Sequence, residues 1–153
     1  MSLKNLESLL IASKEAASAF TLQLEGEDRT AEEVQAFINQ TQTVTLAVVR
    51  KSGLPHAAPV IGVCLDGDIH VTVSSGSVLA NCLRRSSEVA FTVVDLVHSV
   101  IGAGRALNLG HVGDLNELRS RLDQASPFER FAPEGWDGHI FRLEPRRFQL
   151  PPG

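Results

Sequence analysis

The stretch that decides the fold runs from Thr43 to Val94 and reads TVTLAVVRKSGLPHAAPVIGVCLDGDIHVTVSSGSVLANCLRRSSEVAFTVV. Its apolar runs are rich in valine, isoleucine and threonine, which favour β-strands. A Gly-Leu-Pro turn at Gly53 follows the first run, and an Asp-Gly pair at Asp66 follows the second. Asp-Gly between apolar runs is a strong signal for a two-residue hairpin. The stretch therefore predicts an antiparallel β-meander that is interrupted, after its third strand, by one short helix.

The same patterns predict the bounds of each element. Pro59 inside the second strand indicates an edge strand or a bulge, because proline cannot donate to a ladder. The imperfect alternation of the first strand is typical of a strand buried on both faces. The expected strands are 43–50, 56–65, 68–73, 88–94, 98–109 and 139–150, with helices at 77–85 and from Asp114 onward.

Two further features support this outline downstream. Gly102 and Gly104 in the fifth strand mark a bulge or a close backbone approach. Asp114 and Glu117 have capping-box spacing, so the last helix is expected to begin with Asp114 as its cap.

The N-terminal segment predicts two helices. Residues 3–19 carry leucines and alanines at helical spacing, with Ser13 small enough for a packed face. Thr30 and Glu33 form a capping box that opens a helix burying Val34, Phe37 and Ile38. We therefore divide the chain into an N-terminal helix and loop, residues 1–30, and a barrel, residues 31–153, within a single domain.

These elements predict a mainly β fold with peripheral α-helices, a six-stranded antiparallel barrel whose N-terminal helices cover one mouth. A chain of 153 residues can bury such a core without disulfides or metals.

Composition narrows the function. The net charge is −4, tyrosine is absent and aromatic residues make up 5%, which argues against a nucleic-acid binder. We find no apolar run long enough to span a membrane and no signal peptide. Cys64 and Cys82 lack metal-site spacing and are interpreted as reduced thiols. We expect a cytoplasmic protein without a membrane or nucleic-acid partner.

The segment Ser74-Ser75-Gly76-Ser77 is the first candidate for chemistry. Backbone amides at a helix N-terminus, with serine hydroxyls beside them, can hold a phosphate. The alternative is that Ser75 or Ser77 only caps the helix, which serine commonly does.

Other catalytic signatures are missing. The five histidines have no i, i+4 pair and no ligand spacing, so no metal site is predicted. Neither a nucleophile elbow nor a phosphate-binding or dinucleotide fingerprint occurs. No residue stands out as a general acid or base, and the catalytic residues stay unassigned.

Several short motifs occur in an order that resembles a known family. They are Gly53-Leu54-Pro55-His56, Asp66-Gly67, Ser74-Ser75-Gly76-Ser77, Cys82-Leu83-Arg84-Arg85, Gly104-Arg105-Ala106 and Phe141-Arg142-Leu143-Glu144-Pro145-Arg146. Over residues 34–150 the chain resembles the pyridoxamine 5′-phosphate oxidase-like family of FMN-binding split barrels. The resemblance implies a six-stranded antiparallel split β-barrel with flanking helices.

The resemblance also implies a homodimer with two FMN molecules in clefts between the subunits. In such proteins the phosphate is held by the second strand and by the turn and helix after the third, here 56–61 and 74–79. The ring usually lies against the second strand and residues of the partner. The implied cofactor-binding residues are His56, Ala57, Ala58, Pro59, Val60, Ser74, Ser75, Ser77 and Leu79.

The chain departs from the family at the charged positions. Basic residues expected on the second strand and at the helix start are replaced by Ala58, Val63, Val78 and Leu79. Charge-assisted bonds to phosphate are about twice as strong as neutral ones, so the expected affinity for FMN is lower. The cations that could take this role from another direction are Arg50, Lys51, Arg84 and Arg85.

The leading functional hypothesis is an FMN-binding oxidoreductase that exchanges electrons with a small molecule. Two alternatives stay open: a relative that binds deazaflavin F420 or haem, and a non-enzymatic dimeric binding or stress-related scaffold. The homodimer has separate support, because Leu6, Leu9 and Leu10, together with the strand edges, give more apolar surface than one barrel needs.

Overall fold

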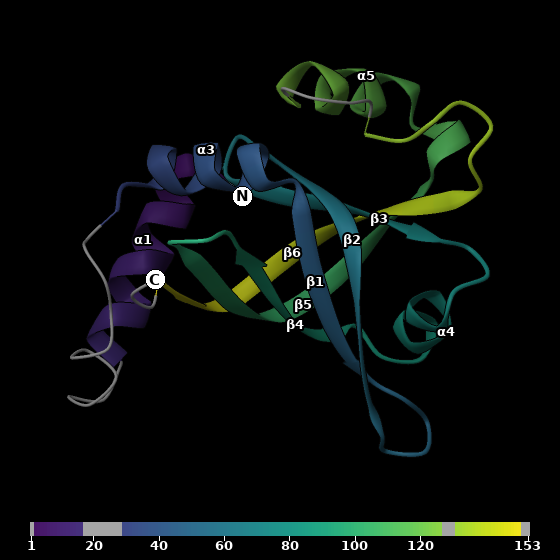
Figure 1. The fold of residues 1–153 in the computed structure, drawn as a ribbon, viewed down its shortest axis with the longest axis horizontal. Helices are drawn as coiled ribbons and strands as arrows, with labels where there is room; N and C mark the ends of the chain where they lie inside the picture. Colours follow the sequence, from purple (N-terminus) through teal and green to yellow (C-terminus); the bar gives the residue numbers. More distant parts are fainter. Residues whose placement is uncertain (1, 17–28, 127–130, 151–153) are drawn as a thin grey trace.

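A computed structural model describes residues 2–16, 29–126 and 131–150 of the chain (Figure 1). The predicted residues 17–19 of the first helix lie outside the described residues. The described elements are, in order, α1 (Leu3–Ala16), α3 (Ala31–Thr41), β1 (Thr43–Val49), β2 (Pro55–Leu65), β3 (Asp68–Ser74), α4 (Val78–Arg85), β4 (Glu88–Val94), β5 (Ser99–His111), the 3-10 helix η1 (Val112–Asp114), α5 (Asn116–Ala125) and β6 (Gly138–Gln149).

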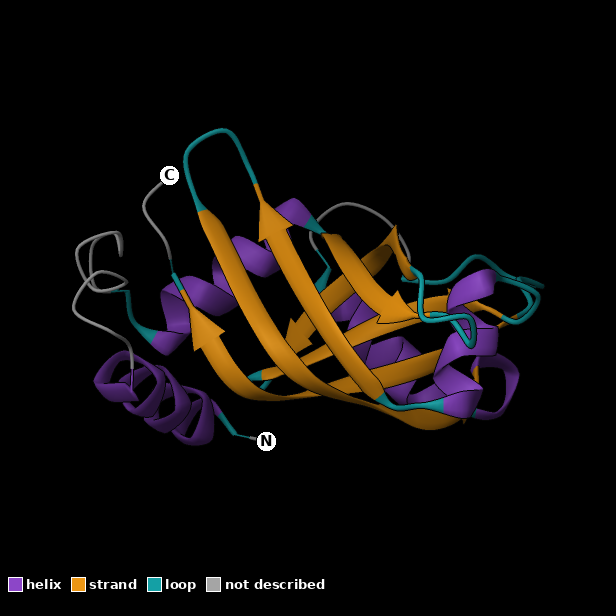
Figure 2. Ribbon diagram, turned by 90° about the horizontal axis from the view of Figure 1, so that it is seen from below, coloured by secondary structure: helices purple, strands orange, loops and turns teal. Residues whose placement is uncertain are grey.

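The six strands close into one antiparallel barrel with the order β1-β2-β3-β6-β5-β4 (Figure 2). The turn between β2 and β3 places both Asp66 and Gly67 at positive φ, 52° and 84°. This conformation suits a two-residue hairpin, in which glycine or aspartate is preferred. The predicted mainly β, six-stranded antiparallel barrel with flanking helices is confirmed.

The barrel is split between β2 and β3. β2 pairs with β1 along Pro55–Ile61, but it pairs with β3 only along Gly62–Leu65. The first half of β2 and the last residues of β3 therefore diverge and leave two strand edges facing each other.

Backbone directions along β2 show which groups face this split. Gly62 N–H donates to the carbonyl of Gln42, and Cys64 exchanges two hydrogen bonds with the Asn39 side chain of α3. Because successive residues of a strand alternate in direction, Ile61, Pro59 and Ala57 direct their backbone groups toward the split. Pro59 thus lies on an edge, where its missing N–H costs no ladder bond, as the sequence predicted.

The main core fills the barrel interior. From β1 it receives Val44, Leu46 and Val48, which are buried, whereas Ala47 is half-buried and Val49 is exposed. The prediction that this strand is buried on both faces was wrong for the single chain. On its outer face Thr43 and Val49 are exposed, and Thr45 and Ala47 are half-buried.

The N-terminal helices pack as the sequence indicated. Glu33 N–H donates to Thr30 Oγ1 and Thr30 N–H donates to Glu33 Oε2, each at 3.2 Å, which completes the capping box. Ser13 is buried on α1 and accepts a 3.0 Å bond from Phe148 N–H of β6.

The apolar stripe of α1 is used inside the chain. Leu6 is fully buried in the barrel core, and Leu9 and Leu10 pack against that core. The expectation that these leucines provide surplus apolar surface for dimerisation was therefore wrong, because they pack within the chain. None of the described helices has the length and apolar character to cross a membrane.

Glycines in β5 permit close packing, as predicted. A Cβ on Gly102 would lie 2.2 Å from the Phe91 ring, and one on Gly104 would lie 2.2 Å from the carbonyl oxygen of Glu144. The β5–β6 register shifts between Ala103 and Gly104, which marks a bulge.

A second apolar cluster forms under α5. Leu122 and Phe131 cover Val63 and Ile140 on the outer face of the sheet. The start of α5 differs from the prediction, because Asp114 ends the 3-10 helix and the residue at the N-cap is Leu115, without a side-chain cap. His111 caps the 3-10 turn instead, since its Nδ1 accepts from Gly113 N–H at 3.0 Å.

Candidate functional site

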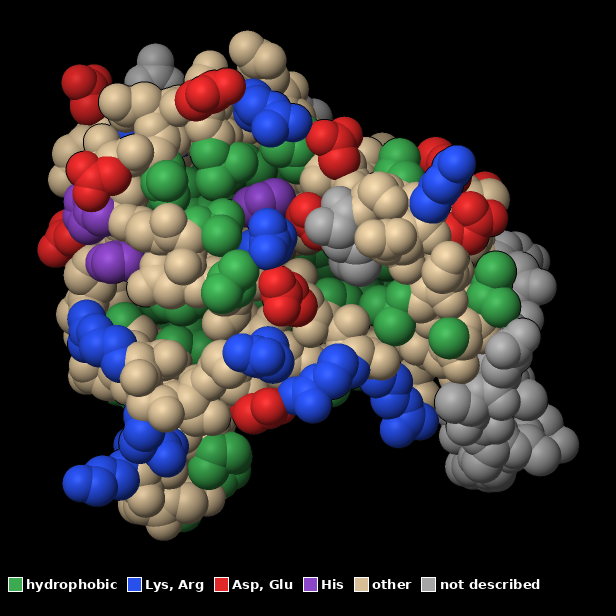
Figure 3. Space-filling view, turned by 180° about the vertical axis from the view of Figure 1, so that it is seen from behind, with side chains coloured by type: hydrophobic (Ala, Val, Ile, Leu, Met, Phe, Trp, Pro, Cys, Tyr) green, Lys and Arg blue, Asp and Glu red, His purple; other side chains and the backbone are tan. Residues whose placement is uncertain are grey.

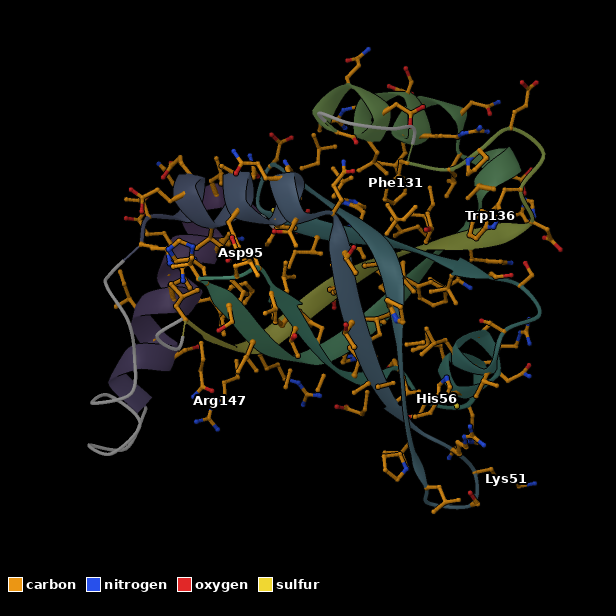
Figure 4. The ribbon with its side chains drawn as sticks, viewed as in Figure 1. Lys51, His56, Asp95, Phe131, Trp136 and Arg147 are labelled. Atoms are coloured by element: carbon orange, nitrogen blue, oxygen red, sulfur yellow. The ribbon has the colours of Figure 1, made fainter. Side chains whose placement is uncertain are left out.

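A pocket of about 420 Å³ occupies the split between β2 and β3. Its walls come from the free edge of β2, the end of β3, the start of α4 and the segment after α5 (Figure 4). Figure 4 shows His56 at the lower end of this region and Phe131 and Trp136 at the upper end. The lining residues are His56, Ala58, Pro59, Val60, Ile61, Thr72, Val73, Ser74, Ser77, Val78, Leu79, Phe131, Pro133 and Trp136.

Most of the predicted site residues meet in this pocket. Ala57 and Ser75 do not line it: the Ala57 side chain is exposed on β2, and Ser75 Oγ donates to Asp137. The predicted residues that the pocket brings together are His56, Ala58, Pro59, Val60, Ser74, Ser77 and Leu79.

The serine hydroxyls have partners within the chain. Ser77 Oγ accepts from Ala80 N–H at 3.1 Å and donates to the carbonyl of Ser74 at 2.8 Å, so Ser77 is the N-cap of α4. Ser75 Oγ donates to Asp137 Oδ1 at 2.9 Å. The sequence left open whether these serines hold a phosphate or cap the helix. Ser77 caps α4, and Ser75 anchors the segment before β6.

Asp137 follows Trp136 of the pocket lining and connects three parts of the fold. Besides Ser75, its Oδ1 accepts from His111 Nε2 at 2.8 Å, and its carbonyl accepts from Ser75 N–H at 3.2 Å. Hydrogen bonds from His111 and then Ser75 lower the pKa of the Asp137 carboxyl. The serine and the histidine both donate to the carboxylate, so this is not the serine–histidine order of a hydrolase triad.

Trp136 forms an aromatic wall that the sequence analysis did not single out. Its indole lies against Gly138, where a Cβ would be 2.1 Å from the ring. Trp136 N–H donates to the Pro133 carbonyl, and the next residue, Asp137, is anchored to Ser75. The sequence offered one sign of this wall, because the only tryptophan of the chain lies two residues before Gly138, at the start of the last strand.

The pocket is mostly apolar. Among the residues that the structure describes, its lining contains no Asp, Glu, Lys or Arg. Three of the positions where the family resemblance led us to expect cations, Ala58, Val78 and Leu79, do line it, whereas Val63 is buried under α5. The pocket therefore suits an apolar group, and its polar side chains are those of His56, Thr72, Ser74 and Ser77.

Three titratable side chains, those of Cys64, His70 and Cys82, are buried outside the pocket. Burial raises the pKa of the Cys64 thiol to about 12, and burial lowers the pKa of His70. Cys64 and Cys82 are both free and buried. Within residues 2–16, 29–126 and 131–150, no group of three or more His, Cys, Asp and Glu side chains is arranged to hold a metal ion.

Solved structures of similar fold come from Mycobacterium smegmatis. An FAD and haem binding protein has a TM-score of 0.64 at 16% identity, with 82% of this chain and 72% of that chain covered. An FAD binding protein has a TM-score of 0.59 at 18% identity, covering 82% and 98%. A haem binding protein has a TM-score of 0.60 at 20% identity, covering 82% and 55%, so this chain spans about half of that protein. These likenesses show the fold.

A search of curated proteins found no match. The family comparison is specific, however: the model described as pyridoxamine 5′-phosphate oxidase matches residues 30–150, from the cap of α3 to the end of the last strand. The match covers the whole barrel and most of the chain. The chain belongs to the pyridoxamine 5′-phosphate oxidase family.

Proposed function

We propose that the split pocket binds a flavin, FMN in the first instance, and that the protein is a flavin-dependent oxidoreductase acting on a small molecule. The observation that carries the proposal is the pocket itself, an apolar slot between two unpaired strand edges. Its volume of about 420 Å³ lies in the range of small-ligand sites.

The residues present fit the flat ring of a flavin. Ala58, Val60 and Leu79 offer small apolar surface, and Trp136 offers an aromatic face on the other side. The backbone groups of Ala57 and Ile61 that face the split are available to the polar edge of a ring. A bound flavin would supply the redox chemistry, and these residues would orient it and exclude water.

The phosphate of FMN fits residues 74–79, where it was expected, less well than the ring fits the pocket. Free amides at the start of α4 remain suitable for an anion. The hydroxyls of Ser75 and Ser77 are already engaged, so two of the expected donors are not free. We therefore expect the ring to contribute more than the serine hydroxyls to affinity.

The alternatives are a haem or deazaflavin cofactor in the same pocket, or a scaffold that binds none. The structurally similar proteins described as binding haem, or FAD and haem, give the haem alternative a specific basis. We propose the cytoplasm as the compartment, because both cysteines are free.

A homodimer is part of the proposal. Ala47, Ala90 and Ala103 align across β1, β4 and β5 in a groove of about 510 Å³ on the outer face of the barrel. Arg146 and Glu88, which also line this groove, form an ion pair. Figure 3 shows further Lys and Arg side chains along the lower edge of the face seen from behind. The small side chains leave this groove open, so that side chains of a second barrel can pack closely into it.

One absorption spectrum of the purified protein, followed by titration with FMN, FAD, haem and deazaflavin, tests the proposal. Bound flavin absorbance, or saturable uptake of FMN, is the expected result. A Soret band on haem addition without flavin uptake would favour the haem alternative. Protein that takes up none of these groups would contradict the enzyme proposal and favour the scaffold.

A further inference from the structure

The cations near the pocket differ in what they already bind. Arg84 donates from Nη2 to the Ser75 carbonyl at 2.8 Å and from Nη1 to Asn81 at 2.6 Å. Arg85 donates to the carbonyl of Val49 on β1. Neither arginine lines the pocket. These two side chains hold the ends of α4 and β1 in place.

Arg50 has a different partner. Its Nη2 lies 3.2 Å from His56 Nδ1, and His56 lines the pocket. A guanidinium group only donates hydrogen bonds, so Nδ1 of His56 must be the acceptor. The imidazole then carries its proton on Nε2, which leaves one N–H donor for a group in the pocket, with the Arg50 charge behind it.

The position of His56 suits the anionic end of a ligand. His56 and Ala58 point to the same face of β2, and residues two apart lie about 7 Å from each other along a strand. Ala58 is one of the positions where a cation was expected. Trp136 lies at the opposite end of the pocket (Figure 4), so the pocket has a basic end and an aromatic end.

We propose that Arg50, acting through His56, is the positive charge that this chain uses to bind the anionic group of its ligand, in place of the missing strand and helix cations. His56 is the contacting residue and Arg50 is a positioning residue that fixes its tautomer. The proposal rests on the proposed function, because it takes the ligand to be an aromatic ring that carries a phosphate.

Binding of FMN and of riboflavin, which lacks the phosphate, tests this inference without any activity measurement. The ratio of the two dissociation constants isolates the phosphate contribution, since changes in ring binding cancel. A charge-assisted hydrogen bond is worth a factor of roughly ten or more in affinity. We expect the wild-type protein to bind FMN at least about tenfold more tightly than riboflavin.

The variants Arg50→Ala and His56→Ala should reduce this ratio to about threefold or less, and Arg50→Lys should retain part of it. Lys51→Ala is the matched control, because it removes the same charge from the next residue. Lys51 lies at the hairpin tip, does not line the pocket, and is further from the barrel than His56 (Figure 4). The ratio for Lys51→Ala should equal that of the wild type.

The outcomes separate this inference from the proposed function. A wild-type ratio near one, or a ratio unchanged in Arg50→Ala, overturns the inference while flavin binding stands. An equal fall of the ratio in Arg50→Ala and Lys51→Ala also overturns the inference, because it would show only a general electrostatic attraction between the hairpin and the phosphate. If the wild-type protein binds neither flavin, the proposed function fails and the inference fails with it.

Discussion

Trp136 is the only tryptophan of the chain, and the sequence has no tyrosine. Because Trp136 lines the pocket, its fluorescence reports on that site alone. We predict that FMN binding quenches this fluorescence at saturation, and that Trp136→Ala weakens FMN binding by a factor of about two to ten through lost stacking. Trp136→Phe keeps an aromatic face and should bind nearly as the wild type does. Saturable FMN uptake seen by absorbance, with tryptophan emission unchanged, would contradict this placement of the ring.

His70 gives a prediction about pH. Burial lowers the pKa of His70 below its ordinary 6.5, so the unfolded chain binds its proton at higher pH than the folded chain does. Stability from this group is therefore complete above about pH 6.5 and is lost as the pH falls toward the folded-state pKa. We predict that His70→Asn flattens the decline in unfolding free energy between about pH 7 and about pH 5. Denaturant titrations at several pH values measure this, and parallel curves for the two proteins would rule out the assignment.

Pocket residues within the Thr43–Val94 meander could be predicted from the sequence, whereas those far from it in sequence could not. His56, Ala58 and Leu79 were predictable because they lie in the meander, where local strand and turn signals and the family order agree. Trp136 was not, because it reaches the pocket through the pairing of β6 with β3, in which Gly138 lies opposite Ser74. The engagement of Ser75 by Asp137 follows from the same long-range pairing, and residue types near Ser75 carry no sign of it.

At the scale of elements, the close contact of β4 and β5 depends on Gly102. Phe91 is 1% exposed, so its ring has little room to move away from an added methyl group. We predict that Gly102→Ala lowers the free energy of unfolding by about 1–3 kcal/mol through overpacking. Gly76→Ala is the matched control, since a Cβ there meets nothing within 4 Å, and it should change stability by less than about 0.5 kcal/mol. Equal stability of the two variants in denaturant unfolding would show that the barrel adapts at Gly102.

Local signals predicted most elements and failed where tertiary contacts compete. The Asp66-Gly67 hairpin and the Thr30 capping box have strong intrinsic preferences and were confirmed. Asp114 has the spacing of a cap, but the chain forms a 3-10 turn there because His111 satisfies the Gly113 amide. The outer face of β1 was predicted to be buried because β1 has apolar residues on both faces, and these residues alone do not show which face is covered.

For the whole molecule, the proposed dimer is tested on the alanine groove. Ala90 is exposed at its centre, between Ala47 and Ala103. We predict that the wild-type protein sediments as a dimer at micromolar concentration and that Ala90→Arg sediments as a monomer, because the arginine prevents close packing. Ala12→Arg, on an exposed position of α1, is the matched control and should remain dimeric. A monomeric wild-type protein, or a dimeric Ala90→Arg, would exclude this face as the interface.

We propose that the split between β2 and β3 is the flavin site of the whole molecule. A crystal structure of the protein grown with FMN would locate the cofactor. We expect density for the ring between Val60 and Trp136, with the phosphate directed toward His56. Density for FMN elsewhere, such as in the groove of β1, β4 and β5, with the pocket in the split empty, would show that the split is not the flavin site.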